Sequence, residues 1–229
     1  MVRKRTKIVA TISDKNCEPD FISQLYEAGM NVVRINSAHL DLDGALRIIR
    51  NVRAVSDKIA ILIDTKGPEI RTTFCDNPIT VKKGRTIKII GDPDKESSPE
   101  ILYVSLRRFV EEIPLGAMVM IDDGEIELKA VRKEGDTLIC KAENDGIIGS
   151  RKSVNIPGVK IDLPSLTDKD RSFIKMAAEN DIEFIAHSFV RSRQDAVDVQ
   201  AEINKYNSGI KIIAKIENQE GVENITDIL

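Results

Sequence analysis

The sequence lacks the residues on which several classes of protein depend. It contains no tryptophan, and its three cysteines, Cys17, Cys75 and Cys140, lie far apart without the spacing of metal ligands. Neither a disulfide framework nor a zinc site is expected from such a pattern, and a reducing compartment suits it best. We therefore expect a cytoplasmic protein.

Long hydrophobic runs are also missing. A membrane-spanning helix needs about 20 consecutive apolar residues, and the basic residues 1–7 lead into a short strand pattern rather than into the apolar core of a signal peptide. The formal net charge of -3 gives no general attraction to nucleic acid or to acidic membranes. We expect neither as a partner, so any anion must be bound locally.

What the sequence does contain is an alternation of strand and helix patterns. Apolar, β-branched runs of strand length occur at 6–12, 31–36, 59–64, 182–189 and 211–217, and helical apolar spacing occurs at 19–28, 41–55, 167–180 and 194–206. The strands are apolar nearly throughout, which is typical of a parallel sheet covered on both faces. These parts predict an α/β fold whose last strand is buried and ends at Glu217.

The segment between these parts has a different sequence pattern. From about 72 to 155, short alternating runs are separated by turn signals such as Asp123-Gly124 and Gly135-Asp136. They predict an all-β insert, a small barrel with one short helix near 106–113. The expected organisation is a barrel domain in two parts, 1–71 and 156–229, with an inserted β-barrel domain at 72–155.

Polar side chains close four of the predicted α/β strands. They are Arg34, Asn36, Asp64, Lys66, Ser188, Lys215 and Glu217. Strand side chains two residues apart lie on one face, and in a βα barrel such ends converge on the rim where active sites are built. Cations there can clamp a phosphate and carboxylates can hold Mg²⁺, so phosphoryl or enolate chemistry is indicated. No Gly-rich phosphate loop accompanies them.

Several of these residues also have a plainer interpretation. Lys215 and Glu217 could form an ion pair that closes an ordinary strand. His39 and His187 fit a structural role better than a catalytic one, since neither belongs to a nucleophile or metal pattern. The segment Asp122-Asp123-Gly124 suits a hairpin turn as well as it suits a site.

Six segments together resemble the N-terminal part of a bacterial-type pyruvate kinase. They are 6–12, 29–36, 64–72, 154–158, 188–191 and 215–218. The resemblance implies a (β/α)8 TIM-type barrel, interrupted after its third strand by a mobile β-barrel lid. It also implies phosphoryl transfer from phosphoenolpyruvate to ADP, giving pyruvate and ATP in glycolysis, with Mg²⁺ (or Mn²⁺) and K⁺ as cofactors.

The resemblance further implies roles for individual residues. Arg34 and Lys215 would be catalytic, and together with Ser188 they would bind the phosphate of the substrate. Arg71 and, from the lid, Lys152 would contact the phosphates of the nucleotide.

Metal ligands are implied in the same way. Glu217 would hold Mg²⁺, while Asn36, Asp64 and the carbonyl of Thr65 would hold K⁺. In the family the residues after Asn36 usually read Phe-Ser-His-Gly, whereas this chain has Ser-Ala-His-Leu at 37–40. Alanine cannot supply the hydroxyl that completes the K⁺ site, which places K⁺ binding in doubt.

The resemblance reaches only the fifth of eight barrel strands. We expect an open sheet edge and an uncovered apolar face, a missing second Mg²⁺ carboxylate, and a chain that is inactive or nearly so by itself. The full-length enzyme is expected to be a homo-oligomer. Two alternatives stay open: a catalytically degenerate paralogue that only binds ligands or a subunit, and another Mg²⁺-dependent barrel enzyme acting on pyruvate or an enolate.

Overall fold

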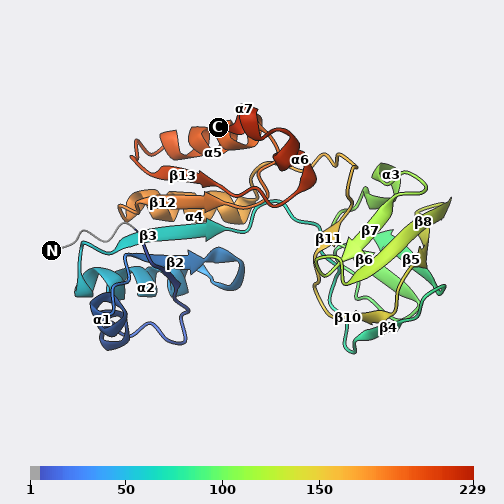
Figure 1. Cartoon of the computed structure of the whole chain (residues 1–229), viewed down its shortest axis with the longest axis horizontal. Helices are drawn as coiled ribbons and strands as arrows, with labels where there is room; N and C mark the ends of the chain where they lie inside the picture. Colours follow the sequence, from blue (N-terminus) through green and yellow to red (C-terminus); the bar gives the residue numbers. More distant parts are fainter. Residues whose placement is uncertain (1–5) are drawn as a thin grey trace. The chain divides into compact units, whose positions relative to one another are not determined.

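The computed structural model describes residues 6–229, so that most of the basic start of the chain lies outside the described residues. It divides into two compact units (Figure 1). Unit 1 comprises the described residues up to Pro68 together with Leu163–Leu229, and unit 2 comprises Glu69–Asp162. Within residues 6–229, no helix has the length and apolar character needed to cross a bilayer.

Unit 1 is built on a parallel five-stranded sheet. In spatial order its strands are β1 (Val9–Thr11), β2 (Val32–Asn36), β3 (Ala60–Thr65), β12 (Phe184–His187) and β13 (Lys211–Ala214). Every pairing is parallel, and each strand lies beside the preceding α/β strand of the chain. This order is that of an incomplete TIM-type barrel, which confirms the predicted fold class.

Four helices connect these strands. They are α1 (Pro19–Glu27), α2 (Leu42–Val55), α4 (Asp168–Glu179) and α5 (Arg193–Asn204). Pro19 occupies the first turn of α1, while Asp41, Thr167 and Ser192 cap the other three helices by accepting a backbone N–H. Shorter elements are η1 (Ser37–His39), α6 (Gln219–Glu223) and α7 (Ile225–Ile228).

The core of unit 1 lies between the helices and one face of the sheet. The helices pack in a row, α1 on α2, α2 on α4 and α4 on α5, and alternate strand residues such as Ile35, Ile63 and Ile185 are fully buried beneath them. On the other face Val9 is 51% exposed and Ile213 is 41% exposed. Among the described residues the edge strands therefore leave part of this face uncovered, as expected of five strands that do not close a barrel.

Strand β13 also differs from its prediction. It ends at Ala214 rather than Glu217, and Lys211 and Ile213 are exposed because β12 is its only described partner. The backbone ladder nevertheless continues for one residue: the Lys215 N–H donates to the His187 carbonyl at 3.0 Å, and the Lys215 carbonyl accepts from the Val190 N–H at 3.1 Å. Lys215 is thus held beside β12 although the strand has ended.

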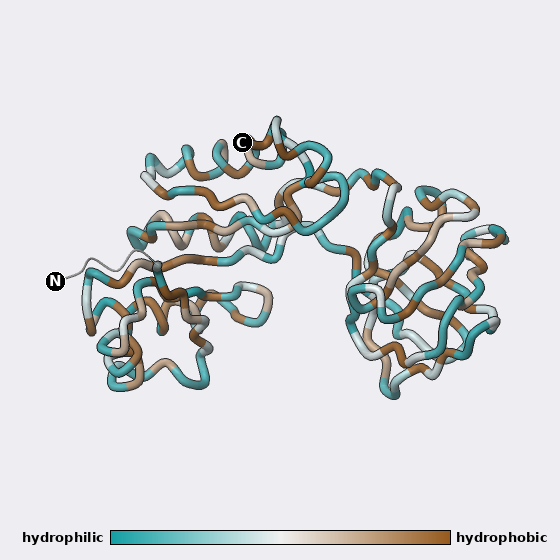
Figure 2. The backbone as a smooth tube through the Cα atoms, viewed as in Figure 1, coloured by the Kyte–Doolittle hydropathy of each residue, from teal (hydrophilic) through white to brown (hydrophobic). Residues whose placement is uncertain are grey.

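Unit 2 is all-β apart from one helical turn, α3 (Phe109–Glu112). Its six-stranded sheet has the order β11 (Val154–Asn155), β7 (Met118–Ile121), β8 (Ile126–Glu134), β9 (Thr137–Ala142), β5 (Thr86–Gly91) and β6 (Ile101–Val104), and β4 (Ile79–Val81) pairs with β10 (Gly146–Ile148). Hydrophobic and hydrophilic residues alternate along several of these strands, whereas the central strands of unit 1 are more continuously hydrophobic (Figure 2).

The segment around Arg71 and Thr72 closes the sheet of unit 2 into a barrel. Arg71 bridges to Ser153, next to β11, and Thr72 bridges to Val104 in β6. Strands β11 and β6 stand at opposite ends of the sheet order, so this one segment joins the two edges. The predicted small β-barrel is present, and its role as a mobile lid stays a prediction.

Candidate active site

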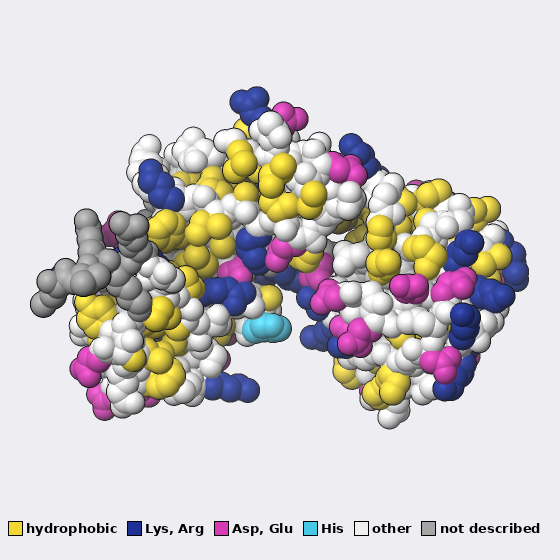
Figure 3. Space-filling view, viewed as in Figure 1, with side chains coloured by type: hydrophobic (Ala, Val, Ile, Leu, Met, Phe, Trp, Pro, Cys, Tyr) yellow, Lys and Arg dark blue, Asp and Glu magenta, His cyan; other side chains and the backbone are white. Residues whose placement is uncertain are grey.

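The strands of unit 1 bring polar side chains together at their carboxyl ends. The residues concerned are Thr11, Arg34, Asn36, Asp64, Ser188, Lys215 and Glu217. Lys, Arg, Asp and Glu side chains gather at the edge of unit 1 to which the strand arrows of Figure 1 point (Figure 3). Six of the seven unit 1 residues that the sequence pattern selected belong to this group, and the seventh, Lys66, directly follows β3.

Asp64 lies at the centre of this cluster. Its carboxylate is 4% exposed, with Arg34 Nη2 at 2.5 Å from Oδ2 and Lys215 Nζ at 3.1 Å from Oδ1. The Ser188 hydroxyl also donates to Oδ1, at 3.2 Å, and Arg34 Nη1 donates to Thr11 Oγ1 at 2.9 Å. One buried carboxylate thus holds two cations, whose side chains stay 33% and 28% exposed and can reach a ligand.

Lys215 and Glu217 extend the cluster. Lys215 Nζ donates to Ser188 Oγ at 2.8 Å and lies 3.2 Å from Glu217 Oε1. The other oxygen of Glu217 accepts the Phe189 N–H at 3.1 Å. Phe189 has φ of 57°, a left-handed conformation that is unusual for a bulky residue and that recurs at functional sites. This backbone turn aims an N–H at the carboxylate.

The residues proposed for K⁺ offer suitable donors. Asn36 and Asp64 are register partners on neighbouring strands, and K⁺ is bound in proteins by oxygen atoms such as theirs and the Thr65 carbonyl. The Asn36 side-chain oxygen accepts the Ala38 N–H at 3.0 Å. Among the described side chains, the fully buried Ser37 hydroxyl has no hydrogen-bond partner. The donor set fits the ion in kind, and Ala38 adds no side-chain oxygen to it.

Donors for a divalent ion are fewer. Residues 6–229 hold no group of three or more His, Cys, Asp or Glu side chains placed to bind a metal. Glu217 offers a carboxylate that is 36% exposed and already pairs with Lys215. It fits Mg²⁺ as one ligand of a site, since Mg²⁺ binds carboxylate oxygen and keeps several waters.

Arg71 and Lys152 belong to unit 2, and the cluster around Asp64 does not include them. Each pairs with an acid of its own unit: Arg71 Nε lies 2.7 Å from Glu69 Oε2, and Lys152 Nζ lies 2.5 Å from Asp122 Oδ2. The hydrogen bond that Lys152 donates to Asp122 raises the pKa of Lys152. Asp122 and Asp123 occupy the β7–β8 turn, both with φ of 55°, so the turn interpretation of this segment holds and Asp122 has an ion pair as well.

Sequence reasoning did not select two neighbours of the cluster. Thr11 is the last residue of β1. Its position at a strand end could have identified it as a member of the site. His187 is buried and bonds to Thr65 and Ser165, in line with the structural role expected for it. His39, the other histidine, is exposed.

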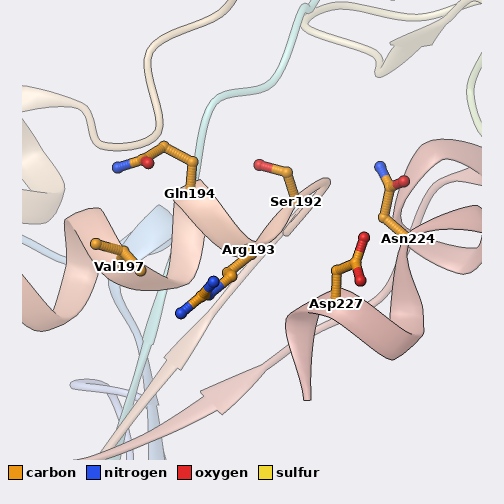
Figure 4. A pocket seen from close by; sticks show the side chains of 6 residues that line it. All are labelled: Ser192, Arg193, Gln194, Val197, Asn224 and Asp227. Atoms are coloured by element: carbon orange, nitrogen blue, oxygen red, sulfur yellow. The ribbon is translucent and has the colours of Figure 1, made fainter.

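A pocket of about 530 Å³ lies elsewhere in unit 1 (Figure 4). Its lining comes from α5 and from the region of α7: Ser192, Arg193, Gln194, Val197, Asn224 and Asp227. Two of its polar side chains already have partners, since Gln194 donates to Asp198 at 2.7 Å and Asn224 donates to the Arg191 carbonyl at 2.9 Å. The pocket contains none of the clustered residues.

Known proteins resemble the chain along its whole length. The family model described as pyruvate kinase, barrel domain, matches residues 3–229. A pyruvate kinase from Borreliella burgdorferi is 49% identical over 229 residues, which are 100% of this chain and 48% of that protein. A pyruvate kinase from Geobacillus stearothermophilus is 39% identical over 236 residues, covering 100% of this chain and 40% of that protein.

A plant relative has a similar extent. The probable pyruvate kinase, cytosolic isozyme, of Arabidopsis thaliana is 37% identical over 236 residues, covering 99% of this chain and 48% of that protein. The chain thus spans less than half the length of these curated relatives.

Proposed function

Because the chain belongs to the pyruvate kinase family, we propose that it forms part of an enzyme that transfers the phosphoryl group of phosphoenolpyruvate to ADP. Pyruvate and ATP are the products, and glycolysis is the general role. The observation that carries the proposal is the pair of partly exposed cations, Arg34 and Lys215, held by the buried Asp64. A homo-oligomeric full-length enzyme and a cytoplasmic location belong to the same proposal.

Arg34 and Lys215 supply what phosphoryl transfer demands. The transition state spreads negative charge over the phosphoryl oxygens, so catalysis rests on positioning and on fixed positive charge. In our proposal Arg34 binds the transferring phosphate, and Lys215 stabilises its charge and that of the developing enolate. Ser188, which donates to Asp64 and accepts from Lys215, is proposed to bind the same phosphate.

The charge balance of the cluster favours an anion that arrives with a cation. Arg34 and Lys215 carry two positive charges, and Asp64 and Glu217 carry two negative charges. Mg²⁺ supplies neutralisation of phosphoryl oxygens when bound, and we propose Glu217 as one of its ligands. For K⁺ we propose Asn36, Asp64 and the Thr65 carbonyl. Mn²⁺ is the expected substitute for Mg²⁺.

In unit 2, Arg71 and Lys152 are proposed to contact the phosphates of the nucleotide. Both are paired with carboxylates, so nucleotide binding exchanges one anionic partner for another. The pair of Lys152 with Asp122 keeps the ammonium charged, because it raises the pKa.

Binding of phosphoenolpyruvate tests this proposal directly. Calorimetric titration of the chain with phosphoenolpyruvate in Mg²⁺ and K⁺ should show binding, and Arg34→Gln or Lys215→Met should weaken it by about 10- to 100-fold, as expected for a lost charge-assisted hydrogen bond. Matched controls are Arg50→Gln and Lys211→Met, since both residues are exposed in unit 1. Equal affinity in test and control variants would refute the proposed site.

A second candidate function is binding without turnover. It is favoured by Ala38 and by the absence, among residues 6–229, of a complete group of divalent-metal ligands. A lactate-dehydrogenase-coupled assay separates the two: we expect little or no pyruvate formation from this chain alone, and turnover near that of a full-length enzyme would contradict that expectation. The other alternative, a different enolate-forming barrel enzyme, finds no support in the relatives named above.

A further inference from the structure

His187 is a buried ionisable residue that the proposed chemistry does not use. Its side chain is almost entirely enclosed, and both ring nitrogens have partners. Nε2 lies 2.9 Å from the Ser165 carbonyl oxygen, and Nδ1 lies 2.8 Å from Thr65 Oγ1. A carbonyl oxygen can only accept, so Nε2 carries a hydrogen.

The second hydrogen bond joins the ring to a strand end. Thr65 Oγ1 lies 2.8 Å from Nδ1, and its other partner, the Ala186 carbonyl oxygen, is farther away at 3.3 Å. The contact with His187 is therefore the shorter of the two hydrogen bonds open to the Thr65 hydroxyl.

This hydrogen bond joins the ends of two strands behind the candidate site. Thr65 and His187 are the last residues of β3 and β12 and are register partners in the parallel ladder. By strand alternation their side chains share the helix-covered face with Ile63 and Ile185. The neighbouring residues Asp64 and Ser188 lie on the other face, where the Ser188 hydroxyl donates to Asp64.

We propose that His187 is a positioning residue for the candidate active site. The hydrogen bond at Nδ1 fixes the Thr65 side chain, and through the backbone of β3 it fixes the Asp64 carboxylate that aligns Arg34 and Lys215. The effect on ligand affinity rests on the proposed function, whereas the effect on Arg34 does not. The role needs no contact between the imidazole and a substrate.

Two substitutions separate the two hydrogen bonds of the ring. His187→Asn places a side-chain oxygen near the position of Nδ1 and can still accept from Thr65. His187→Gln places an amide N–H near the position of Nε2 and retains the bond to Ser165. Thr65→Val removes the same hydrogen bond from the other side while keeping the shape of the side chain, and His39→Gln is a control at the exposed histidine.

The readout is the Arg34 Nε–H signal in ¹⁵N-edited NMR of the whole chain, because this N–H donates to Asp64 Oδ2 at 2.7 Å. We expect His187→Gln and Thr65→Val to shift the signal in the same direction, and His187→Asn to restore it toward the wild-type position. Phosphoenolpyruvate affinity should fall about two- to tenfold in the first two variants, the size expected for one neutral hydrogen bond. His39→Gln should change neither quantity.

Two results would overturn the proposal. One is an Arg34 Nε–H signal that responds equally to His187→Asn and His187→Gln, because a purely structural histidine would lose stability in both without distinguishing Thr65. The other is a wild-type imidazole whose Nδ1 makes no hydrogen bond, read from ring ¹⁵N shifts. If the wild-type chain binds no phosphoenolpyruvate, the proposed function fails, and the Arg34 signal still decides the role of His187.

Discussion

Asp64 balances two cations with one buried carboxylate, which makes it sensitive to the loss of its charge. Arg34 and Lys215 both lie within 3.1 Å of its oxygens. An amide in place of the carboxylate would leave Arg34 without its buried counterion and Lys215 with Glu217 alone. We expect Asp64→Asn to lower the free energy of unfolding by about 1–3 kcal/mol. Urea unfolding beside Asp57→Asn, an exposed change in the same unit, measures the difference, and equal loss in both would contradict us.

Asp195 gives the chain part of its acid sensitivity. It accepts from Arg191 Nη2 at 2.9 Å and from the Ser192 N–H at 3.1 Å. Burial alone would raise its pKa, but the hydrogen bonds and charge of Arg191 outweigh burial and lower the pKa below its ordinary value. Its contribution is therefore fully present above about pH 4, the unfolded value, and is lost as the pH falls through the lowered folded value.

Replacing Asp195 should flatten this pH dependence. We expect Asp195→Asn to cost about 1–3 kcal/mol at pH 7 and to lose less further stability than the wild type between pH 5 and pH 2. Urea unfolding at several pH values measures both quantities. Parallel curves for the wild type and the variant would show that Asp195 is not the titrating group.

The sequence predicted site residues that stand at the ends of strands. It did not predict the contacts that these residues make with partners far away in the chain. Arg34, Asp64 and Lys215 could be selected because a charge closes an apolar run. The sharing of Asp64 between the other two could not, since Lys215 lies 151 positions from it in the chain. His187 likewise finds Thr65 across 122 positions, and no local pattern records such a contact.

The connection that follows β3 depends on a glycine. Gly67 has φ of 66°, and a Cβ there would overlap the Ser188 carbonyl oxygen. Gly135 in the β8–β9 turn has φ of 56° but open space around it. Both positions would strain an alanine by about 1–2 kcal/mol, and only Gly67 would add the overlap.

Gly67→Ala should therefore destabilise its unit clearly more than Gly135→Ala destabilises the other. Residue-resolved amide hydrogen exchange measures each unit separately. We expect faster exchange in β3 and β12 of Gly67→Ala and little change in unit 1 of Gly135→Ala. Similar losses in the two variants would mean that the backbone near Ser188 adapts.

Elements with their own end signals were predicted best. Helix α4 begins after Thr167 as expected, because the capping residue is local information. Strands β12 and β13 are shorter than their apolar runs, since a strand ends where its neighbour stops pairing. The partly exposed face of the unit 1 sheet was expected from the strand count, because five strands cannot close a barrel, whereas an apolar run by itself does not reveal whether anything covers its second face.

The whole chain combines an open sheet with a closed one. Strands β1 and β13 each have one described neighbour, whereas unit 2 joins its edges through the bridges of Arg71 and Thr72. Closure removes the unpaired strand edges that promote aggregation. Turn signals in the sequence predicted the insert and its β character. They could not predict which segment closes the barrel, because the closing bridges join residues 32 and 82 positions apart.

This difference predicts that unit 2 folds alone and depends on its closing segment. A fragment of residues 69–162 contains both sides of the closure and a buried core of its own. We expect it to be monomeric, with dispersed amide signals in NMR and cooperative urea unfolding. A fragment of residues 75–150 lacks Arg71, Thr72 and Ser153, so its β6 and β7 edges stay unpaired, and we expect it to unfold or aggregate. Equal stability of the two fragments would show that the bridges at Arg71 and Thr72 do not hold the barrel closed.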